Sequence, residues 1–230
     1  SAIVSANRLP KNVLTIVLVP LKDLAIQWEK EIKQYDPNAE TIICDGDHGE
    51  WKEKLPQKLN KFLSRNEDYE IKNRTYVIVT ASTAISKRKN EDQSTFLKNF
   101  RHINQNQIMV IGDEVHHYGS PKYREVFEIS ARYKLGLSAT YRRSWDEEGT
   151  DEILNYFGRP LSEAEYSITQ GIADNRLSQY SYHPFFTMLE QDEFEKYAKL
   201  SEKINKLHSN EKNSNGSTGL EEARSALLNQ

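Results

Sequence analysis

The sequence predicts an α/β fold, in which a mainly parallel sheet lies between two layers of helices and a helical appendage follows at the C-terminal end. Three observations support this prediction. Short runs rich in Val and Ile alternate with longer helical patterns, as expected when helices cover a parallel sheet. Several of these runs are continuously apolar, which is typical of strands buried on both faces. After about residue 150 the alternation stops and amphipathic helical patterns take over.

Length and composition restrict the class of protein. A chain of 230 residues is long enough for one sizeable α/β domain with an appendage. No apolar run approaches the ~20 residues that span a bilayer, so we predict no membrane segment. The single cysteine, Cys44, excludes an internal disulfide and a cysteine-rich zinc site. Because the first residues also lack the features of a secretory signal, we predict a cytoplasmic protein.

The predicted sheet has five strands with helices between them. The strands are expected at 13–19, 40–44, 75–80, 107–112 and 132–138. The helices are expected at 21–35, 51–65, 83–100 and 121–130. Pro20 stands just before the first of these helices, where its missing N–H costs little. That helix carries a mixed but mostly one-sided apolar pattern, formed by Leu24, Ile26, Trp28, Ile32 and Tyr35.

The C-terminal part is predicted to be less regular. A short helix at 151–158 is expected to end at Gly158. An aromatic strand, an amphipathic helix, a flexible linker rich in Ser, Asn and Gly, and a last helix are then expected at 180–189, 191–207, 208–219 and 220–230.

Two carboxylates follow the fourth predicted strand, in the segment DEVHH. Asp113 and Glu114 stand at the carboxyl end of that strand, where parallel α/β sheets bind ligands. In a nucleotide hydrolase one acid can hold Mg²⁺ through water while its neighbour deprotonates the attacking water. A solvated turn explains the pair equally well. A metal-dependent hydrolase that also uses His116 and His117 is a third alternative, although adjacent side chains of an extended chain point apart and rarely share one ion.

The next predicted strand also ends in a polar segment, SATYRR, which begins at Ser138. Taken together, in this order on consecutive strands, DEVHH and LGLSATYRR resemble motifs II (D-E-x-H) and III (S-A-T) of the superfamily 2 helicases and translocases. The form is most similar to the DEAH-type DNA repair helicases and the motor subunits of restriction enzymes. This resemblance implies a RecA-like lobe, ATP and Mg²⁺ as cofactors, and a nucleic-acid partner, with DNA preferred over RNA.

The resemblance also implies a role for each matching residue. Asp113 would hold Mg²⁺ through water together with the nucleotide, and Glu114 would be the general base. His116, Ser138 and Thr140 would couple the nucleotide site to the nucleic-acid groove and to a second lobe.

Two upstream segments, at 16–32 and 77–85, resemble the parts of these motors that contact a nucleic-acid backbone. The residues implied in such contacts are Pro20, Lys22, Thr80, Ser82 and Thr83. Hydroxyl groups suit phosphates without reading bases, although ordinary strand-to-helix capping explains both segments equally well. A net charge of −3 indicates that any such binding must use a local groove. Arg142 and Arg143 are expected to meet nucleotide, the partner lobe or water.

The phosphate-binding pattern G-x-x-x-x-G-K-[ST] does not occur in these 230 residues. We therefore expect part of a longer motor protein, with little or no ATP hydrolysis by the isolated chain. Residues 1–180 would form a partial RecA-like ATP-binding lobe that lacks the P-loop, and 181–230 a connecting strand and helices towards a second RecA-like lobe. The alternative is a catalytically inactive nucleic-acid- or protein-binding module derived from such a lobe.

Overall fold

The computed structural model describes residues 2–47, 49–64, 73–89 and 91–213. The chain forms two compact units, one up to Glu165 and one from Tyr166 onward. The strands of the first unit are β1 (Leu14–Val19), β2 (Glu40–Cys44), β3 (Thr75–Thr80), β4 (Ile108–Asp113) and β5 (Tyr133–Leu137). Its α-helices are α1 (Ala2–Arg8), α2 (Lys22–Tyr35), α3 (Trp51–Leu63), α4 (Ala81–Ala84) and α5 (Glu147–Phe157).

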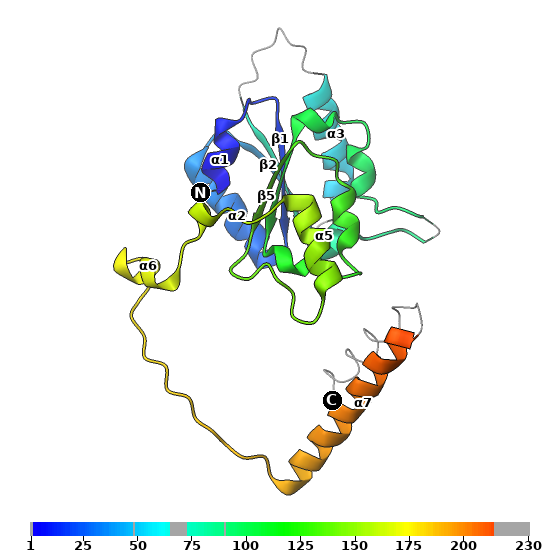
Figure 1. Ribbon diagram of the computed structural model, residues 1–230. Coiled ribbons are helices and arrows are strands. Elements are labelled where there is room, and N and C mark those ends of the chain that lie inside the picture. Colours follow the sequence, from blue (N-terminus) through cyan, green and yellow to red (C-terminus); the bar gives the residue numbers. More distant parts are fainter. Residues whose placement is uncertain (1, 48, 65–72, 90, 214–230) are drawn as a thin grey trace. The chain divides into compact units, whose positions relative to one another are not determined.

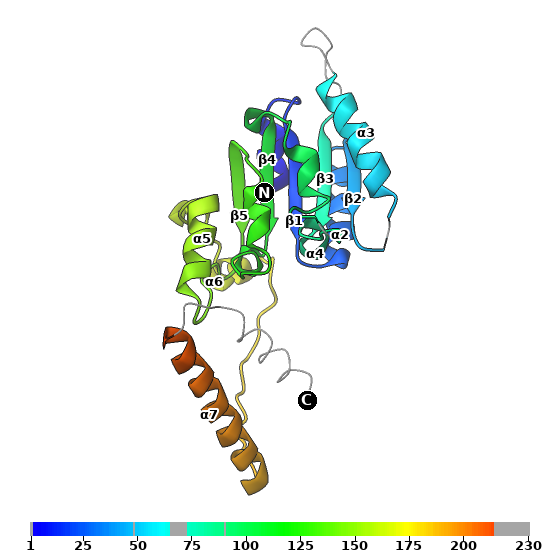
Figure 2. The same ribbon diagram turned by 90° about the vertical axis from the view of Figure 1, so that its right-hand side faces the viewer.

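All five predicted strands are present, and they form one parallel sheet. Its order is β2-β3-β1-β4-β5, as Figure 2 shows with the strands side by side. Every residue of β1 and β3 is buried, which accounts for the continuously apolar character of these runs apart from their threonines. The prediction of a parallel α/β sheet is confirmed.

Helices cover both faces of this sheet (Figure 1). On one face α1 and α2 pack over Val17, Val19 and neighbouring strand residues. On the other face residues of α3 and α5 belong to the core that contains Ile16 and Leu18 of the same strand. Because side chains alternate along a strand, β1 contributes to both cores at once. The result is the three-layer arrangement that the sequence predicts.

Cys44, the last residue of β2, lies in the core that α3 and α5 cover. It is fully buried. Burial, and then the nearby charge of Asp45, raise the pKa of its thiol far above the ordinary value. Cys44 is therefore a structural thiol that stays protonated.

Two predicted helices of the first unit are wrong. Instead of a helix over 83–100, α4 ends at Ala84 and a single 3₁₀ turn forms at Leu97–Phe100. The intervening polar run offers no apolar stripe to bury, and the hydroxyl of Ser94 accepts hydrogen bonds from the N–H groups of Phe96 and Leu97, at 3.0 and 3.4 Å.

Instead of a helix over 121–130, a 3₁₀ segment forms at Arg124–Glu128. Its turns close by bonds to the third residue back, such as the 3.1 Å bond from the N–H of Val126 to the carbonyl of Tyr123. Nε of Arg124, the first residue of this segment, also donates to the carbonyl of Gly119 at 2.8 Å, a local polar contact that is no part of a regular helix.

The second unit holds α6 (Ile168–Ala173) and α7 (Gln191–Asn213). The predicted aromatic strand at 180–189 is wrong: this segment has no strand pairing, and Phe185 and Phe186 are 95% and 96% exposed. An extended chain becomes a strand only when another strand pairs with its backbone, and none in the described residues does so. The helix predicted at 191–207 is confirmed and continues to Asn213, into the expected linker.

The rest of the expected linker and the predicted helix at 220–230 lie outside the described residues. Within the part of the chain that the structure describes, each helix is too short or too polar to cross a lipid bilayer.

Candidate nucleotide and nucleic-acid site

The candidate residues gather because four parallel strands end at one edge of the sheet. In the register of the sheet Val19 lies opposite Thr80, and Asp113 lies opposite Leu137. The segments that follow β3, β1, β4 and β5 therefore begin side by side. Parallel strands bring to one place residues that lie far apart in the sequence.

Asp113, the last residue of β4, is held by a residue of α2. The indole Nε1 of Trp28 donates a hydrogen bond to Oδ2 of Asp113 at 2.8 Å. Both residues are half-buried. No other hydrogen bond or ion pair reaches this carboxylate within the described ranges, so Oδ1 is left for a ligand.

Glu114 reverses the chain direction at the end of β4. Its backbone is left-handed, with φ 51° and ψ 55°, a conformation that costs an L-residue about 1–2 kcal/mol. The following 3₁₀ turn (Val115–His117) holds it there, since the N–H of His117 donates to the carbonyl of Glu114 at 3.0 Å. Strain of this kind persists where the surroundings fix it and is common at functional sites.

The two motif segments meet at the hydroxyl of Ser138. Its Oγ lies 3.1 Å from Nδ1 of His116, donates to Oε2 of Glu114 at 3.4 Å, and accepts from the N–H of Thr140 at 3.1 Å. Nδ1 of His116 also lies 3.3 Å from Oε2 of Glu114. With a proton on Nδ1, His116 donates to the Ser138 hydroxyl and to the Glu114 carboxylate. The hydroxyl then donates one hydrogen bond and accepts two, which is its full capacity. The structure thus brings together four of the predicted residues.

His117 and Tyr118 line the same turn. The rings of His116 and His117 pack at 4.5 Å between centroids, so the expectation that adjacent histidines point apart is wrong for this 3₁₀ turn. Partial burial, and then His116, lower the pKa of His117. Burial, and then the charges of Asp113 and Glu114, raise the pKa of Tyr118 well above its usual range, so that it stays neutral.

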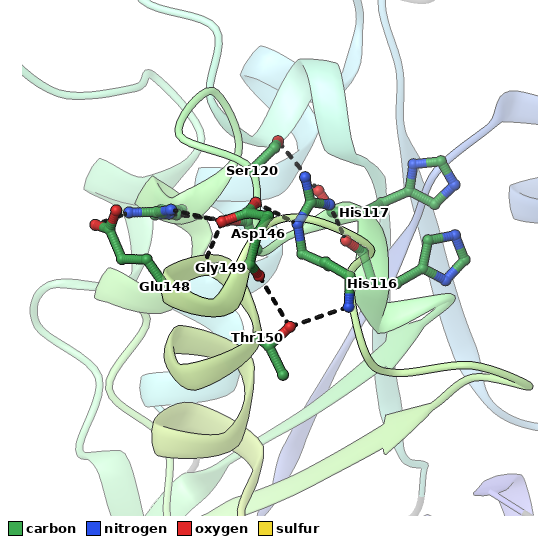
Figure 3. A network of polar contacts seen from close by, with 10 residues as sticks. His116, His117, Ser120, Asp146, Glu148, Gly149 and Thr150 are labelled. Carbon is green, nitrogen blue, oxygen red and sulfur yellow. Dashed lines mark hydrogen bonds and ion pairs between the residues drawn. The ribbon is translucent and has the colours of Figure 1, made fainter. Parts of the chain in front are cut away.

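A polar network, drawn in Figure 3, joins this turn to the start of α5. The guanidinium of Arg143 donates to the main-chain carbonyl of His116 and, through Nε, to Oδ2 of Asp146 at 2.6 Å. Asp146 caps α5 by accepting from the N–H of Gly149 at 2.8 Å. The hydroxyl of Thr150 accepts from the N–H of Arg143 at 3.0 Å. Arg143 therefore ties the chain after β5 to the chain after β4.

The five residues implied in nucleic-acid contacts stand at the same edge, with Thr80 as the last residue of β3 and the others just after β1 or β3. Lys22 is exposed enough to reach a ligand, but it now forms an ion pair with Asp47 at 2.5 Å, which raises its pKa. Ser82 is exposed, whereas Thr80 and Thr83 are buried and the hydroxyl of Thr80 donates to that of Thr83 at 2.9 Å.

Pro20 is half-buried and directly precedes α2. Together with Lys22 and Ser82 it forms the accessible part of this surface.

A lone metal ion does not fit the described residues, because no group of three or more His, Cys, Asp or Glu side chains converges there. The alternative of a zinc-type hydrolase has no ligand set in that part of the chain. The free oxygen of Asp113 fits Mg²⁺ that is also bound by water and phosphate oxygens, since Mg²⁺ in nucleotide sites takes only one or two protein carboxylates.

Two contacts of the candidate site were not predicted from the sequence. The bond from Trp28 to Asp113 joins residues 85 positions apart, and no local signal points to it. Arg143 was expected to meet nucleotide, the partner lobe or water. The acidic residues at 146–148 could have indicated its true partner, because Asp followed by Glu-Glu is typical of a helix N-terminus.

Comparisons with known proteins give the chain a family context. The family described as "Type III restriction enzyme, res subunit" matches residues 2–143. The chain is 28% identical over 147 residues to a protein named as a DNA 3′-5′ helicase, Rad25, of Haloarcula marismortui, covering 64% of this chain and 19% of that protein. It is 40% identical over 58 residues to a protein named as an ATP-dependent RNA helicase of Acanthamoeba polyphaga mimivirus, covering 25% and 11%.

The chain thus spans less than a fifth of the length of these relatives. Among solved structures, the Sulfolobus solfataricus SWI2/SNF2 ATPase core in complex with dsDNA aligns with a TM-score of 0.39 at 16% identity, over 76% of this chain and 34% of that one. A de novo designed protein with a P-loop NTPase fold aligns with a TM-score of 0.30 at 11% identity, over 73% and 98%.

Proposed function

We propose a function that starts from family membership. The chain belongs to the family of type III restriction enzyme res subunits. Membership confirms the resemblance to the superfamily 2 helicases that DEVHH and SAT carry. We propose that, in the full-length protein, this lobe couples ATP hydrolysis to movement along nucleic acid or to its unwinding. The proposed domain division is a partial RecA-like lobe at 1–180 and a connector at 181–230 towards a second lobe.

The observation that carries this proposal is the cluster of Glu114, His116 and Ser138 beside Asp113. Bound Mg²⁺ would neutralise charge on the phosphates and help to place them. Asp113 would hold the water shell of that ion through its free oxygen. Glu114 would accept the proton of the attacking water, because its carboxylate is held at the strand edge by contacts with Ser138 and His116.

The same cluster would relay the state of the nucleotide. Ser138 touches Glu114 and His116, and Thr140 follows it directly. A change in what Glu114 contacts would therefore alter hydrogen bonds in the segment after β5. Arg143 would carry that change into α5, since it binds the carbonyl of His116 on one side and Asp146 on the other.

We propose that nucleic acid lies along the segments after β1 and β3. Lys22 and Ser82 would contact phosphates, with Pro20 shaping the surface. The hydrogen bond between the buried residues Thr80 and Thr83 would hold the backbone around Ser82 in place. DNA is the proposed substrate, which is also the substrate in the name of the Haloarcula relative. We place the protein in the cytoplasm.

The experiment is ATP turnover by the full-length protein with and without DNA or RNA oligonucleotides. Glu114→Gln should lower DNA-stimulated turnover by about 10²- to 10⁴-fold while ATP binding persists, because the amide cannot take a proton. Glu147→Gln, which changes an exposed acid in the first turn of α5, is the matched control and should be unchanged. A protein that binds nucleic acid but never ATP would instead be the inactive binding module, and full activity of Glu114→Gln would contradict the assigned base.

A further inference from the structure

We infer that Trp28 is a positioning residue for the nucleotide site, whose indole N–H sets the orientation of the Asp113 carboxylate. This inference rests on the proposed function. Nothing in the motifs after β4 and β5 involves α2, so Trp28 adds a third segment of chain to the site.

The contact has the geometry of a full hydrogen bond. Nε1 of Trp28 lies 2.8 Å from Oδ2 of Asp113, which is within the ordinary range of N–H···O hydrogen bonds and also suits an ionised acceptor. Both side chains are half-buried, so water competes less for the carboxylate than it would at an open surface.

The donor itself is held in place. Trp28 packs against the core layer that α2 forms with β1 and β3, and α2 is a regular helix of 14 residues. Its ring position is therefore set by packing rather than by a loop. Residues that support a ligand in this way set the geometry that a metal ion meets.

The chemical nature of the donor matters as well. An indole N–H donates and never accepts, and it carries no charge. It can fix one oxygen of Asp113 while leaving the negative charge that attracts Mg²⁺ undiminished. A Lys or Arg in this place would orient the carboxylate equally well but would cancel its charge. With Oδ2 held by Trp28, Oδ1 would be the oxygen of Asp113 available to the water shell of a bound ion.

The position of Trp28 along α2 suggests a second effect. Lys22, the proposed phosphate contact, begins the same helix, six residues or about 9 Å along the axis from Trp28. Nucleic acid bound at the start of α2 would therefore act on the same rigid element that orients Asp113. Loss of the hydrogen bond should reduce stimulation by nucleic acid as well as Mg²⁺ affinity.

The test compares Trp28→Phe with Trp51→Phe in the full-length protein. Trp51 is a matched control because its indole N–H also donates one hydrogen bond, to the carbonyl of Asp45 at 2.9 Å, in the other core layer. In Trp28→Phe the Mg²⁺ concentration for half-maximal ATP turnover should rise roughly tenfold. Stimulation by DNA should fall, whereas Trp51→Phe should change neither. Trp28→His, which returns a ring N–H, should recover part of the loss.

A spectroscopic measurement gives a readout besides activity. In protein labelled with 5-fluorotryptophan, the ¹⁹F resonance absent from Trp28→Phe belongs to Trp28. It should shift when Mg²⁺ and a non-hydrolysable ATP analogue are added together and should return when EDTA removes the ion. An unmoved resonance and an unchanged Mg²⁺ dependence, in a protein that still hydrolyses ATP, would overturn the role of Trp28 alone. A protein that binds no nucleotide would overturn the proposed function and this inference with it.

Discussion

Nδ1 of His116 lies 3.1 Å from Oγ of Ser138, so a residue that follows β4 and a residue that follows β5 share one hydrogen bond. The same hydroxyl reaches Glu114. A single side chain without charge thus joins the two motif segments of the site, and it can be removed with little change of volume.

Ser138→Ala should weaken the coupling between nucleic acid and ATP hydrolysis. Removal of this hydroxyl leaves His116 and Glu114 without their shared partner, which costs about 1.5 kcal/mol, or roughly tenfold in rate. DNA-stimulated ATP turnover of the full-length protein is the measurement. Ser120→Ala is the control, because among the residues that the structure describes the Ser120 hydroxyl bonds only to the nearby carbonyl of His117, and turnover should be unaffected. Equal losses in both variants would refute the coupling role.

Arg143→Ala should lower the free energy of unfolding by about 2–3 kcal/mol, because it removes two charge-assisted hydrogen bonds and leaves Asp146 without its closest cation. The Arg143 side chain is only 21% exposed, so solvent screens this interaction weakly. Its neighbour Arg142 is exposed, and Arg142→Ala should stay within about 0.5 kcal/mol. Urea unfolding measures the free energy of unfolding of both variants. Similar decreases in the two would show that Arg143 does not join the segment after β5 to the segment after β4.

The free energy of unfolding should fall in acid, in part because Asp146 becomes protonated. Burial opposes its ionisation, but the hydrogen bonds from Arg143 and the N–H of Gly149 outweigh burial and lower its pKa. A lowered folded-state pKa gives stability that is present above the unfolded value, about pH 4, and is lost as the pH falls through the folded value. Asp146→Asn should therefore be less stable than the wild type at pH 6, with the difference shrinking below about pH 4. A pH-independent difference in unfolding free energy would contradict this account.

Gly149→Ala should be strongly destabilising, by more than about 2 kcal/mol. A methyl group at Gly149 would overlap the carboxylate of Asp146, which is held by Arg143, and the carbonyl of Gly119, which accepts from Nε of Arg124 at 2.8 Å. Gly46 has open space around its Cα and an ordinary φ, so Gly46→Ala is the control and should be nearly neutral. The midpoints of thermal unfolding of the two variants are compared. Equal midpoints would show that the backbone around Gly149 moves enough to accommodate the methyl group.

The strands were predictable because burial on both faces leaves a strong mark on composition. Ile16, Val17 and Leu18 are all buried, and short β-branched runs of this kind are typical of strands covered on both sides. The helices predicted at 83–100 and 121–130 were wrong, because local polar contacts that the apolar pattern does not show decide where a helix ends. The hydroxyl of Ser94 turns the chain into a 3₁₀ segment where propensity alone favours continuation of a helix.

The residues of the site that belong to the two motifs were predictable from the sequence. Asp113, Glu114, His116 and Ser138 were expected at one edge of the sheet, and the register of β4 and β5 places them there. Their chemical roles stay predictions. The contact of Trp28 could not be predicted, since an indole on the apolar face of a helix indicates packing until the partner strand is located.

The burial of Cys44 has a practical consequence. It is the single thiol of the 230 residues, and its burial at the end of β2 closes it to thiol reagents. A cysteine introduced at an open position such as Ser144 would therefore be labelled alone, with the native residue left in place. A fluorophore at that position, in the segment between Ser138 and α5, would let single molecules report when this part of the chain moves.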